Sequence, residues 1–269
     1  MKCYRHSWMV DEPLATVILV HGTGEHHGRY EHVARFLNNR GFQVASGDLP
    51  GWGRTPGRKG HIEQFDDYIE AVAGWVAEEQ QTKQSDNYPV FLLGHSLGGL
   101  IAARYVETYA GQHGLAGLVL SSPCLQLRLA ISPWKRKLAD VLNELMPTLR
   151  LGNGIAPFQV SRDPRVREAY VKDPYNYAKV SVRWFHELQT AMEASFQEEK
   201  RVDLPVLTVQ AGADSLVNPD AVEQFVYALP VADKQFVKYE GLYHEVLNEP
   251  EKEIVLTEIA DWMAKRLHK

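Results

Sequence analysis

One serine lies in a sequence context that could make it a nucleophile. Ser96 stands between Gly94 and Gly98, in a run that is apolar from Pro89 and continues past Leu97 with apolar residues at helical spacing. This pattern predicts a strand, a sharp turn and a helix, with the serine at the apex of the turn. The glycines permit the reversal because a side chain at either position would crowd the backbone. The helix would direct its free N–H groups at the serine, where an oxyanion would develop.

A serine hydroxyl needs a neighbouring base, and the base needs a carboxylate that orients it. Asp214 and His244 each lie in a loop directly after a predicted strand, and reacting groups gather at such strand ends in parallel sheets. The chain order Ser96, Asp214, His244 is the order expected of a catalytic triad on this architecture. Asp220 is the alternative carboxylate, although it is expected in the first turn of the next helix. Glu245 is expected to be a solvated neighbour of the base.

An oxyanion hole requires two backbone N–H groups near the serine. Leu97, the residue after the nucleophile, is predicted to supply one, and Thr23, in a glycine-rich loop after the first apolar strand, the other. A tight strand-to-helix turn is the alternative explanation of that loop. It accounts for the glycines but not for His21-Gly22 lying opposite the turn at Ser96.

These groups must be positioned by alternating strands and helices. The predicted strands are apolar throughout, which favours a parallel sheet covered by helices on both faces and therefore an α/β fold. They span residues 15–20, 42–46, 90–94, 115–120, 204–210 and 234–239. The intervening helices are expected at about 30–40, 62–81, from 97, 219–229 and 250–267. Between about 125 and 201 only helical stretches appear, so we expect one domain over 1–269 with a helical cap inserted at about 125–201.

Composition narrows the class of partner. The formal net charge of −5 gives no basic surface for nucleic acid. No apolar run approaches the roughly 20 residues of a membrane helix, and the first eight residues lack the apolar core of a secretion signal. The two cysteines, Cys3 and Cys124, suit reduced thiols rather than a disulfide framework or a metal cluster. We therefore expect a cytoplasmic protein, with no metal, no cofactor and no obligate protein partner.

The predicted cap allows two interpretations. Apolar residues between Leu127 and Leu149 fall near helical spacing, beside the basic cluster Lys135, Arg136 and Lys137. The favoured interpretation is a helix that packs on its own domain with a solvated basic side. The other is an interfacial helix that makes transient contact with an anionic membrane surface, which would make the protein peripheral to the membrane.

Taken together, these motifs resemble those of the monoacylglycerol lipase and lysophospholipase family of α/β-hydrolases, in particular its bacillus-type members. The resemblance covers nearly the whole chain, and its most specific segment is His21–Tyr30, followed by Gly94–Gly99, Gly212–Val217, Gly241–Glu245, Gly47–Gly51, Ser121–Leu125 and Val180–Trp184. It implies the same triad and oxyanion donors, and a lid over an acyl tunnel. It also implies that Glu25 and Arg29 lie near the glycerol end of the substrate. Leu247 stands where some animal relatives carry a second histidine, so the headgroup contacts are expected to differ.

The expected function is therefore that of a serine hydrolase that cleaves the ester of a single-chain lipid, with monoacylglycerol as substrate. A lysophospholipase or a small-ester carboxylesterase would need the same triad, as would a thioesterase or a perhydrolase. A non-catalytic binding module on the same fold is the alternative from a different class.

Overall fold

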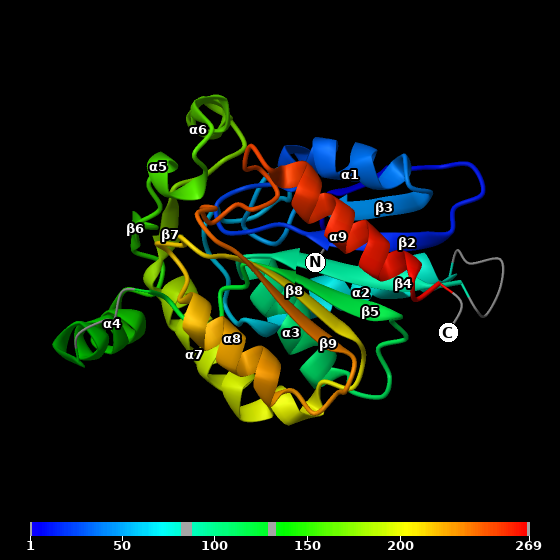
Figure 1. Cartoon of the computed structure of the whole chain (residues 1–269). Coiled ribbons are helices and arrows are strands. Elements are labelled where there is room, and N and C mark those ends of the chain that lie inside the picture. The colour runs from blue at the N-terminus through cyan, green and yellow to red at the C-terminus, as the bar shows by residue number, and fades with distance from the viewer. Residues whose placement is uncertain (1, 82–87, 129–132, 268–269) are drawn as a thin grey trace.

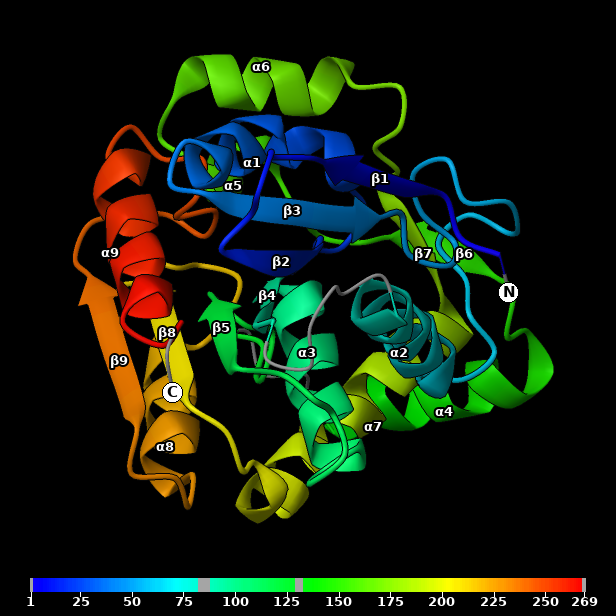
Figure 2. The same cartoon turned by 90° about the vertical axis from the view of Figure 1, so that its right-hand side faces the viewer.

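A seven-stranded sheet runs through the centre of the molecule (Figures 1 and 2). The computed structural model describes residues 2–81, 88–128 and 133–267, without the side chains of residues 133–136 and 138. All neighbouring strands are parallel except the first pair, which is antiparallel. In spatial order the strands are β1 (Arg5–Trp8), β3 (Phe42–Gly47), β2 (Ala15–Val20), β4 (Val90–His95), β5 (Gly117–Ser121), β8 (Val206–Ala211) and β9 (Lys234–Tyr239). The predicted, mostly parallel sheet is confirmed.

Helices cover both faces of the sheet because its central strands are apolar on both sides. In β2, Val17 and Leu19 pack into one core cluster, and Ile18 and Val20 into the other. The first cluster is closed by α1 (Glu31–Asn38) and α9 (Lys252–Ala264), the second by α2 (Asp66–Gln81), α3 (Leu97–Thr108) and α8 (Pro219–Ala228). Figure 2 shows the two layers on either side of the strands.

One strand and one helix start in the first half of the chain differ from the prediction. The edge strand β1 was not predicted, because the sequence Arg-His-Ser-Trp has no apolar run; backbone pairing with β3 holds it. The helix predicted from about residue 62 begins instead at Asp66. The backbone N–H groups of Glu63 and Gln64 donate to the Asp67 carboxylate, which closes a loop in place of a first helical turn.

The chain leaves the sheet between β5 and β8, which are neighbours in it, and residues 122–205 are called the inserted segment below. Figure 1 shows residues 133–181 beside the carboxyl ends of the strands, whereas the helix at 182–198 runs back along the helix at 97–108. It contains α4 (Pro133–Leu145), β6 (Arg150–Gly152), α5 (Pro157–Val160), α6 (Pro164–Lys172), β7 (Lys179–Ser181), α7 (Val182–Glu198) and the 3-10 helix η2 (Glu199–Arg201). The prediction that this region lacks strands is wrong. β6 and β7 pair antiparallel, but each has three residues, too few to form a recognisable apolar run. The predicted cap at about 125–201 stays a prediction.

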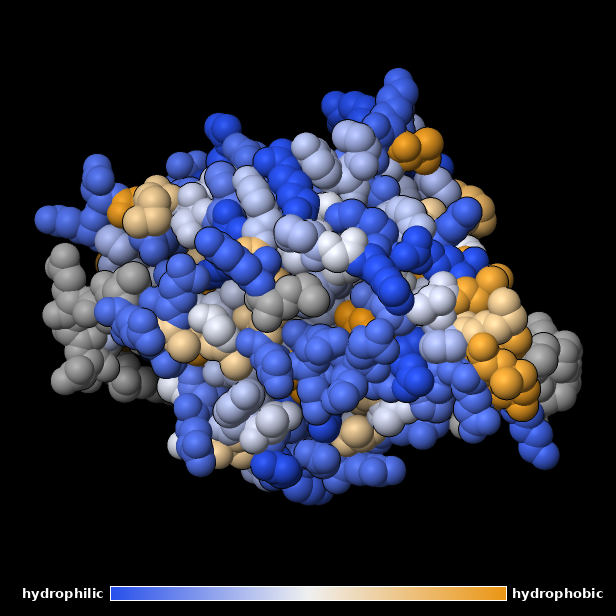
Figure 3. Space-filling model, turned by 180° about the vertical axis from the view of Figure 1, so that it is seen from behind, coloured by the Kyte–Doolittle hydropathy of each residue, from blue (hydrophilic) through white to orange (hydrophobic). Residues whose placement is uncertain are grey.

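The helix α4 packs against α7 but leaves apolar side chains in solvent. Val141 is 51% exposed and Leu145 is 74% exposed, and Figure 3 shows apolar surface gathered at this end of the molecule. Lys137 is exposed, whereas the side chains of Lys135 and Arg136 lie outside the described residues. Within the described ranges, no helix combines the length and the apolar character needed to cross a membrane.

Candidate active site

The predicted strand-turn-helix motif is present, with Ser96 between β4 and α3. Its backbone has φ 52° and ψ −116°, a strained conformation for a residue other than glycine. A Cβ at Gly94 would lie 2.2 Å from the carbonyl oxygen of Gly98, and one at Gly98 would lie 2.1 Å from that of Val20. The glycines are therefore required by the close approach of backbone to backbone.

A chain of hydrogen bonds joins Ser96 to two of the predicted residues. The Oγ atom of Ser96 lies 2.8 Å from Nε2 of His244, whose Nδ1 lies 2.7 Å from Oδ2 of Asp214. Ser96, His244 and Asp214 are 8%, 4% and 1% exposed, respectively. Asp220 is exposed in the first turn of α8, as its sequence position predicted. Asp214, and not Asp220, therefore contacts the histidine.

Electrostatic interactions shift the pKa values of His244 and Asp214 in opposite directions. Burial alone would lower the pKa of His244, but the charge of Asp214 and the hydrogen bond to it raise that pKa above its usual value of 6.5. Burial would raise the pKa of Asp214, yet the contact with His244 and the N–H groups of Leu216 and Val217 bring it below its usual value. Since Asp214 is a carboxylate, Nδ1 of His244 carries the proton that it donates to it. Nε2 of the neutral ring is left to accept from the hydroxyl of Ser96.

The predicted oxyanion donors come from two different segments of the chain. Leu97 is the first residue of α3, and Thr23 lies in the loop after β2. His21 holds that loop: its Nε2 accepts from the N–H of Leu49 at 2.9 Å, so its Nδ1 carries a proton and donates to the Gly22 carbonyl at 2.8 Å. That carbonyl and the N–H of Thr23 belong to one trans peptide and point in opposite directions. His21 therefore sets the direction of the Thr23 N–H.

The hydroxyl of Ser96 faces a cavity of about 490 Å³, which is within the usual size range of ligand pockets. The loops at the carboxyl ends of the strands contribute Thr23, Ser96 and His244 to its walls. The inserted segment contributes mainly apolar side chains, among them Leu142, Leu151, Val180, Val182, Trp184, Phe185 and Leu188. Such a cavity suits an alkyl chain.

A buried ionic group lies beside the hydrogen-bonded triad and consists of Glu25, Arg29 and Glu245. Arg29 donates to both oxygens of Glu245, at 2.7 and 2.8 Å, and also to Glu25. The expectation that Glu245 is solvated is wrong, because it is 4% exposed and paired with Arg29. Sequence reasoning missed the pair because nothing local links two loops so far apart in the chain. The expected contact of Glu25 and Arg29 with the headgroup stays a prediction.

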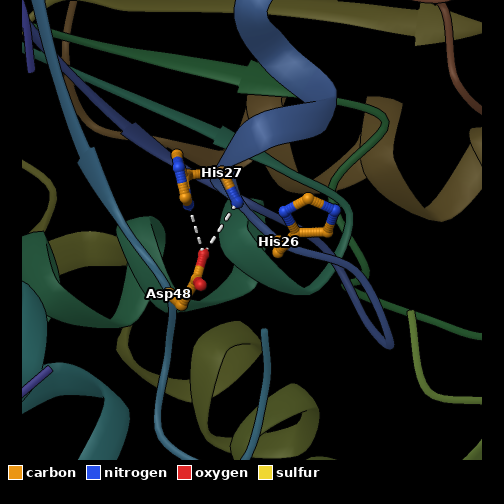
Figure 4. A group of neighbouring side chains, drawn as sticks. All are labelled: His26, His27 and Asp48. Carbon is orange, nitrogen blue, oxygen red and sulfur yellow. Dashed lines mark hydrogen bonds and ion pairs between the residues drawn. The ribbon is translucent and has the colours of Figure 1, made fainter. Parts of the chain in front are cut away.

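A second polar cluster, His26, His27 and Asp48, has the residue types and proximity of a metal site (Figure 4). Its ligand atoms lie within 4.8 Å of one another, but they already have protein partners. Asp48 accepts from the backbone N–H of His27 at 2.9 Å and lies 2.6 Å from its Nδ1. Nδ1 of His26 accepts from the N–H of Gly28, and Nε2 faces Asp173 at 2.8 Å. These hydrogen bonds link the segment after β2 to the loop after β3, which explains the cluster as a structural contact.

A mostly parallel sheet of this strand order, with a serine at a sharp strand-to-helix turn and its partners after the last two strands, defines an α/β-hydrolase. The chain belongs to the family described as serine aminopeptidase, S33, whose model matches residues 11–251.

The relatives agree with the resemblance predicted from the motifs. The chain is 36% identical to phospholipase YtpA of Bacillus subtilis over 250 residues, 93% of this chain and 95% of that protein. It is 32% identical to a monoacylglycerol lipase of Mycolicibacterium smegmatis over 265 residues, 97% of this chain and 92% of the relative. The crystal structure of a monoacylglycerol lipase from Paleococcus ferrophilus matches with a TM-score of 0.89 at 33% identity, covering 99% of this chain and 100% of that one. The predicted monoacylglycerol lipase and lysophospholipase grouping is confirmed.

Proposed function

We propose that this protein is a serine hydrolase that cleaves the carboxylic ester of monoacylglycerol to give a fatty acid and glycerol. The observation that carries the proposal is the hydrogen-bonded chain Ser96–His244–Asp214 at the wall of an apolar cavity of about 490 Å³. The names of the relatives from Mycolicibacterium smegmatis and Paleococcus ferrophilus support the choice of substrate.

In the first half-reaction, Oγ of Ser96 attacks the ester carbonyl carbon while Nε2 of His244 accepts the hydroxyl proton. The N–H groups of Leu97 and Thr23 stabilise the negative oxygen of the tetrahedral intermediate. His244 then donates its proton to the leaving alkoxide, so that glycerol departs and the acyl group remains on Ser96. Asp214 stays ionised and stabilises the imidazolium.

In the second half-reaction, a water molecule gives a proton to His244 and attacks the acyl-enzyme. The same two N–H groups stabilise the second oxyanion, and collapse of this intermediate returns the proton to Ser96 and releases the fatty acid. None of these steps calls for a metal or a cofactor.

A lysophospholipase activity is the second candidate, because the Bacillus subtilis relative named as a phospholipase is 36% identical to this chain. Both reactions would use the same triad and acyl cavity and would differ only at the headgroup. A small-ester carboxylesterase would share the chemistry without needing so large an apolar cavity.

A cytoplasmic location with transient membrane contact belongs to the same proposal. Cys3 and Cys124 are free thiols, as is usual in a reducing compartment. The exposed apolar residues Val141, Leu145 and Phe158 of the inserted segment would suit brief contact with a lipid surface. Co-sedimentation with lipid vesicles, compared between the native chain and Leu145→Ser, tests this contact; equal binding of both would contradict it.

Fatty acid release from a substrate panel tests the main proposal. The panel contains 1-monoacylglycerols, lysophosphatidylcholine, diacylglycerol and p-nitrophenyl esters of several chain lengths. We expect the highest kcat/KM on a monoacylglycerol. Preference for lysophosphatidylcholine would reverse the order of the two candidates, and no hydrolysis of any ester would refute both.

A further inference from the structure

The Glu25 carboxylate holds the loop that carries Thr23. Its Oε1 accepts from the N–H of Gly22 and from the hydroxyl of Tyr30, both at 2.6 Å. Burial would raise the pKa of Glu25, but the positive charge of Arg29 and the other contacts lower it to about 2. Glu25 is therefore a buried carboxylate that binds the N–H of Gly22, the residue before Thr23.

Arg29 joins this loop to the loop that carries His244. It binds Glu25 on one side and both oxygens of Glu245, the residue after His244, on the other. The guanidinium also faces the ring of Tyr170 in α6, 4.9 Å from its centroid. The backbone N–H of Glu245 donates to the carbonyl of Val160 in α5 at 2.9 Å. The network thus spans both sides of Ser96 and reaches the inserted segment.

Stability alone does not explain three buried charges at this place. Removing such groups from water is costly, and well-packed apolar residues of similar volume often give equal or greater stability. A bidentate arginine–carboxylate pair does give a fixed geometry. The arrangement is therefore better suited to holding two loops at a set separation than to strengthening the core.

The hollow beside the network is smaller than a glycerol headgroup. Glu25 and Glu245 line a hollow of about 10 Å³ beside Ser96 and His244, which is enough for roughly one water molecule. Neither they nor Arg29 line the cavity of about 490 Å³. Their polar atoms are instead occupied by one another and by Gly22, Tyr30 and Asn248.

We infer that Glu25, Arg29 and Glu245 are positioning residues. They hold the oxyanion donor Thr23 and the base His244 at fixed positions relative to the nucleophile Ser96. This inference rests on the proposed function, since it assigns the network to the same ester hydrolysis. It differs from the headgroup role expected for Glu25 and Arg29, and the two roles make different predictions.

Kinetics of Glu245→Gln and Arg29→Lys on two esters of one acyl chain, a 1-monoacylglycerol and a p-nitrophenyl ester, test the inference. Both variants weaken the bidentate pair with little change of volume. Because misplacement of reacting groups by about 1 Å can cost on the order of a hundredfold in rate, we expect kcat to fall about 10- to 100-fold on both esters, with little change in KM. A headgroup role would instead lower activity on the monoacylglycerol alone.

The pH profile gives a readout that a merely structural role would not move. Glu245 is one of the negative charges that raise the pKa of His244. Glu245→Gln should therefore shift the acidic limb of kcat/KM to lower pH, because the imidazolium loses a stabilising charge.

Two matched exchanges serve as controls. Glu31→Gln and Arg35→Lys alter an exposed ion pair on α1, and we expect both to stay within about twofold of the native activity. Native kcat in both Glu245→Gln and Arg29→Lys would overturn the inference, as would a loss confined to the monoacylglycerol. If the native protein hydrolyses neither ester, the proposed function itself fails and the inference falls with it.

Discussion

The carboxyl edge of the sheet and the inserted segment are built in opposite ways. At the edge, Ser96, His244 and Asp214 are buried and joined by hydrogen bonds of 2.7 to 2.8 Å. The inserted segment faces the cavity with apolar side chains and leaves others, such as Leu145 and Phe158, in solvent. Hydrogen bonds are directional and fix the relative positions of the groups that they join. Apolar contacts are not directional, and their strength depends on the buried area, so they tolerate a change in shape. The edge should therefore control kcat, and the inserted segment should control KM and acyl-chain preference.

Loss of the base should have the largest effect. We expect His244→Ala to lower kcat about 10⁶-fold, since removing the base from such a triad costs nearly as much as removing the whole triad. Hydrolysis of a p-nitrophenyl ester by the purified variant measures this, with circular dichroism as the control for folding. A fall in kcat of less than about tenfold would contradict the role of His244 as the base.

Loss of the orienting charge should come second. Asp214→Asn keeps the size of the side chain but cannot hold the Nδ1–H tautomer of His244, so we expect kcat to fall about 10⁴-fold. The same exchange at exposed Asp220 is the matched control and should leave kcat within about twofold. Equal losses of kcat in Asp214→Asn and Asp220→Asn would contradict the assignment of Asp214 as the carboxylate that orients His244.

A polar exchange in the cavity should act on KM instead. Phe185 of α7 lines the cavity, and Phe185→Ser removes apolar surface that an acyl chain would contact. We expect KM for long-chain monoacylglycerols to rise about tenfold, with unchanged kcat on p-nitrophenyl acetate. Tyr227→Ser, on the exposed surface of α8, is the control. A fall in kcat on the acetate ester would contradict the division between edge and inserted segment.

The smallest effect is expected away from the cavity, at a buried acid that joins the last turn of α3 to α7 of the inserted segment. Glu107 of α3 accepts from Arg104 at 2.6 Å and from Ser195 of α7 at 3.1 Å, and burial raises its pKa to about 7. A carboxyl group whose pKa is higher in the folded state than in the unfolded state lowers stability as pH rises from about 4.5 to 7.

Thermal unfolding from pH 5 to pH 8 tests this dependence. The Tm of the native protein should fall over that range relative to the Tm of Glu107→Gln, which has no proton to release at this position. Parallel curves for the two proteins would show that folding does not raise the pKa of Glu107 above its value in the unfolded chain.

The sequence was most informative where backbone geometry restricts residue type. Gly94 and Gly98 marked the turn at Ser96, because no other residue fits the observed backbone contacts. The apolar strands predicted the sheet and so brought the loops of Asp214 and His244 to one edge. Side-chain distances in that edge could not be predicted, since they depend on packing between loops far apart in the chain.

The missed features lack local signals. β1 and the pair β6 and β7 are short or polar, and pairing with another strand defines them rather than periodicity. Glu245 was expected to be solvated because its partner Arg29 lies far away in the sequence, in the 3-10 helix His27–Tyr30. The sequence left His21 unexplained, because its role depends on Leu49 donating to Nε2.

The most direct test of the central claim is covalent labelling of Ser96 by a fluorophosphonate that carries a long alkyl chain. We expect mass spectrometry to find one adduct, on Ser96, and excess 1-monoacylglycerol to slow its formation, because lipid and probe would occupy the same cavity. Labelling elsewhere or not at all would contradict the role of Ser96 as nucleophile. Labelling at Ser96 that monoacylglycerol does not slow would contradict the assignment of the cavity.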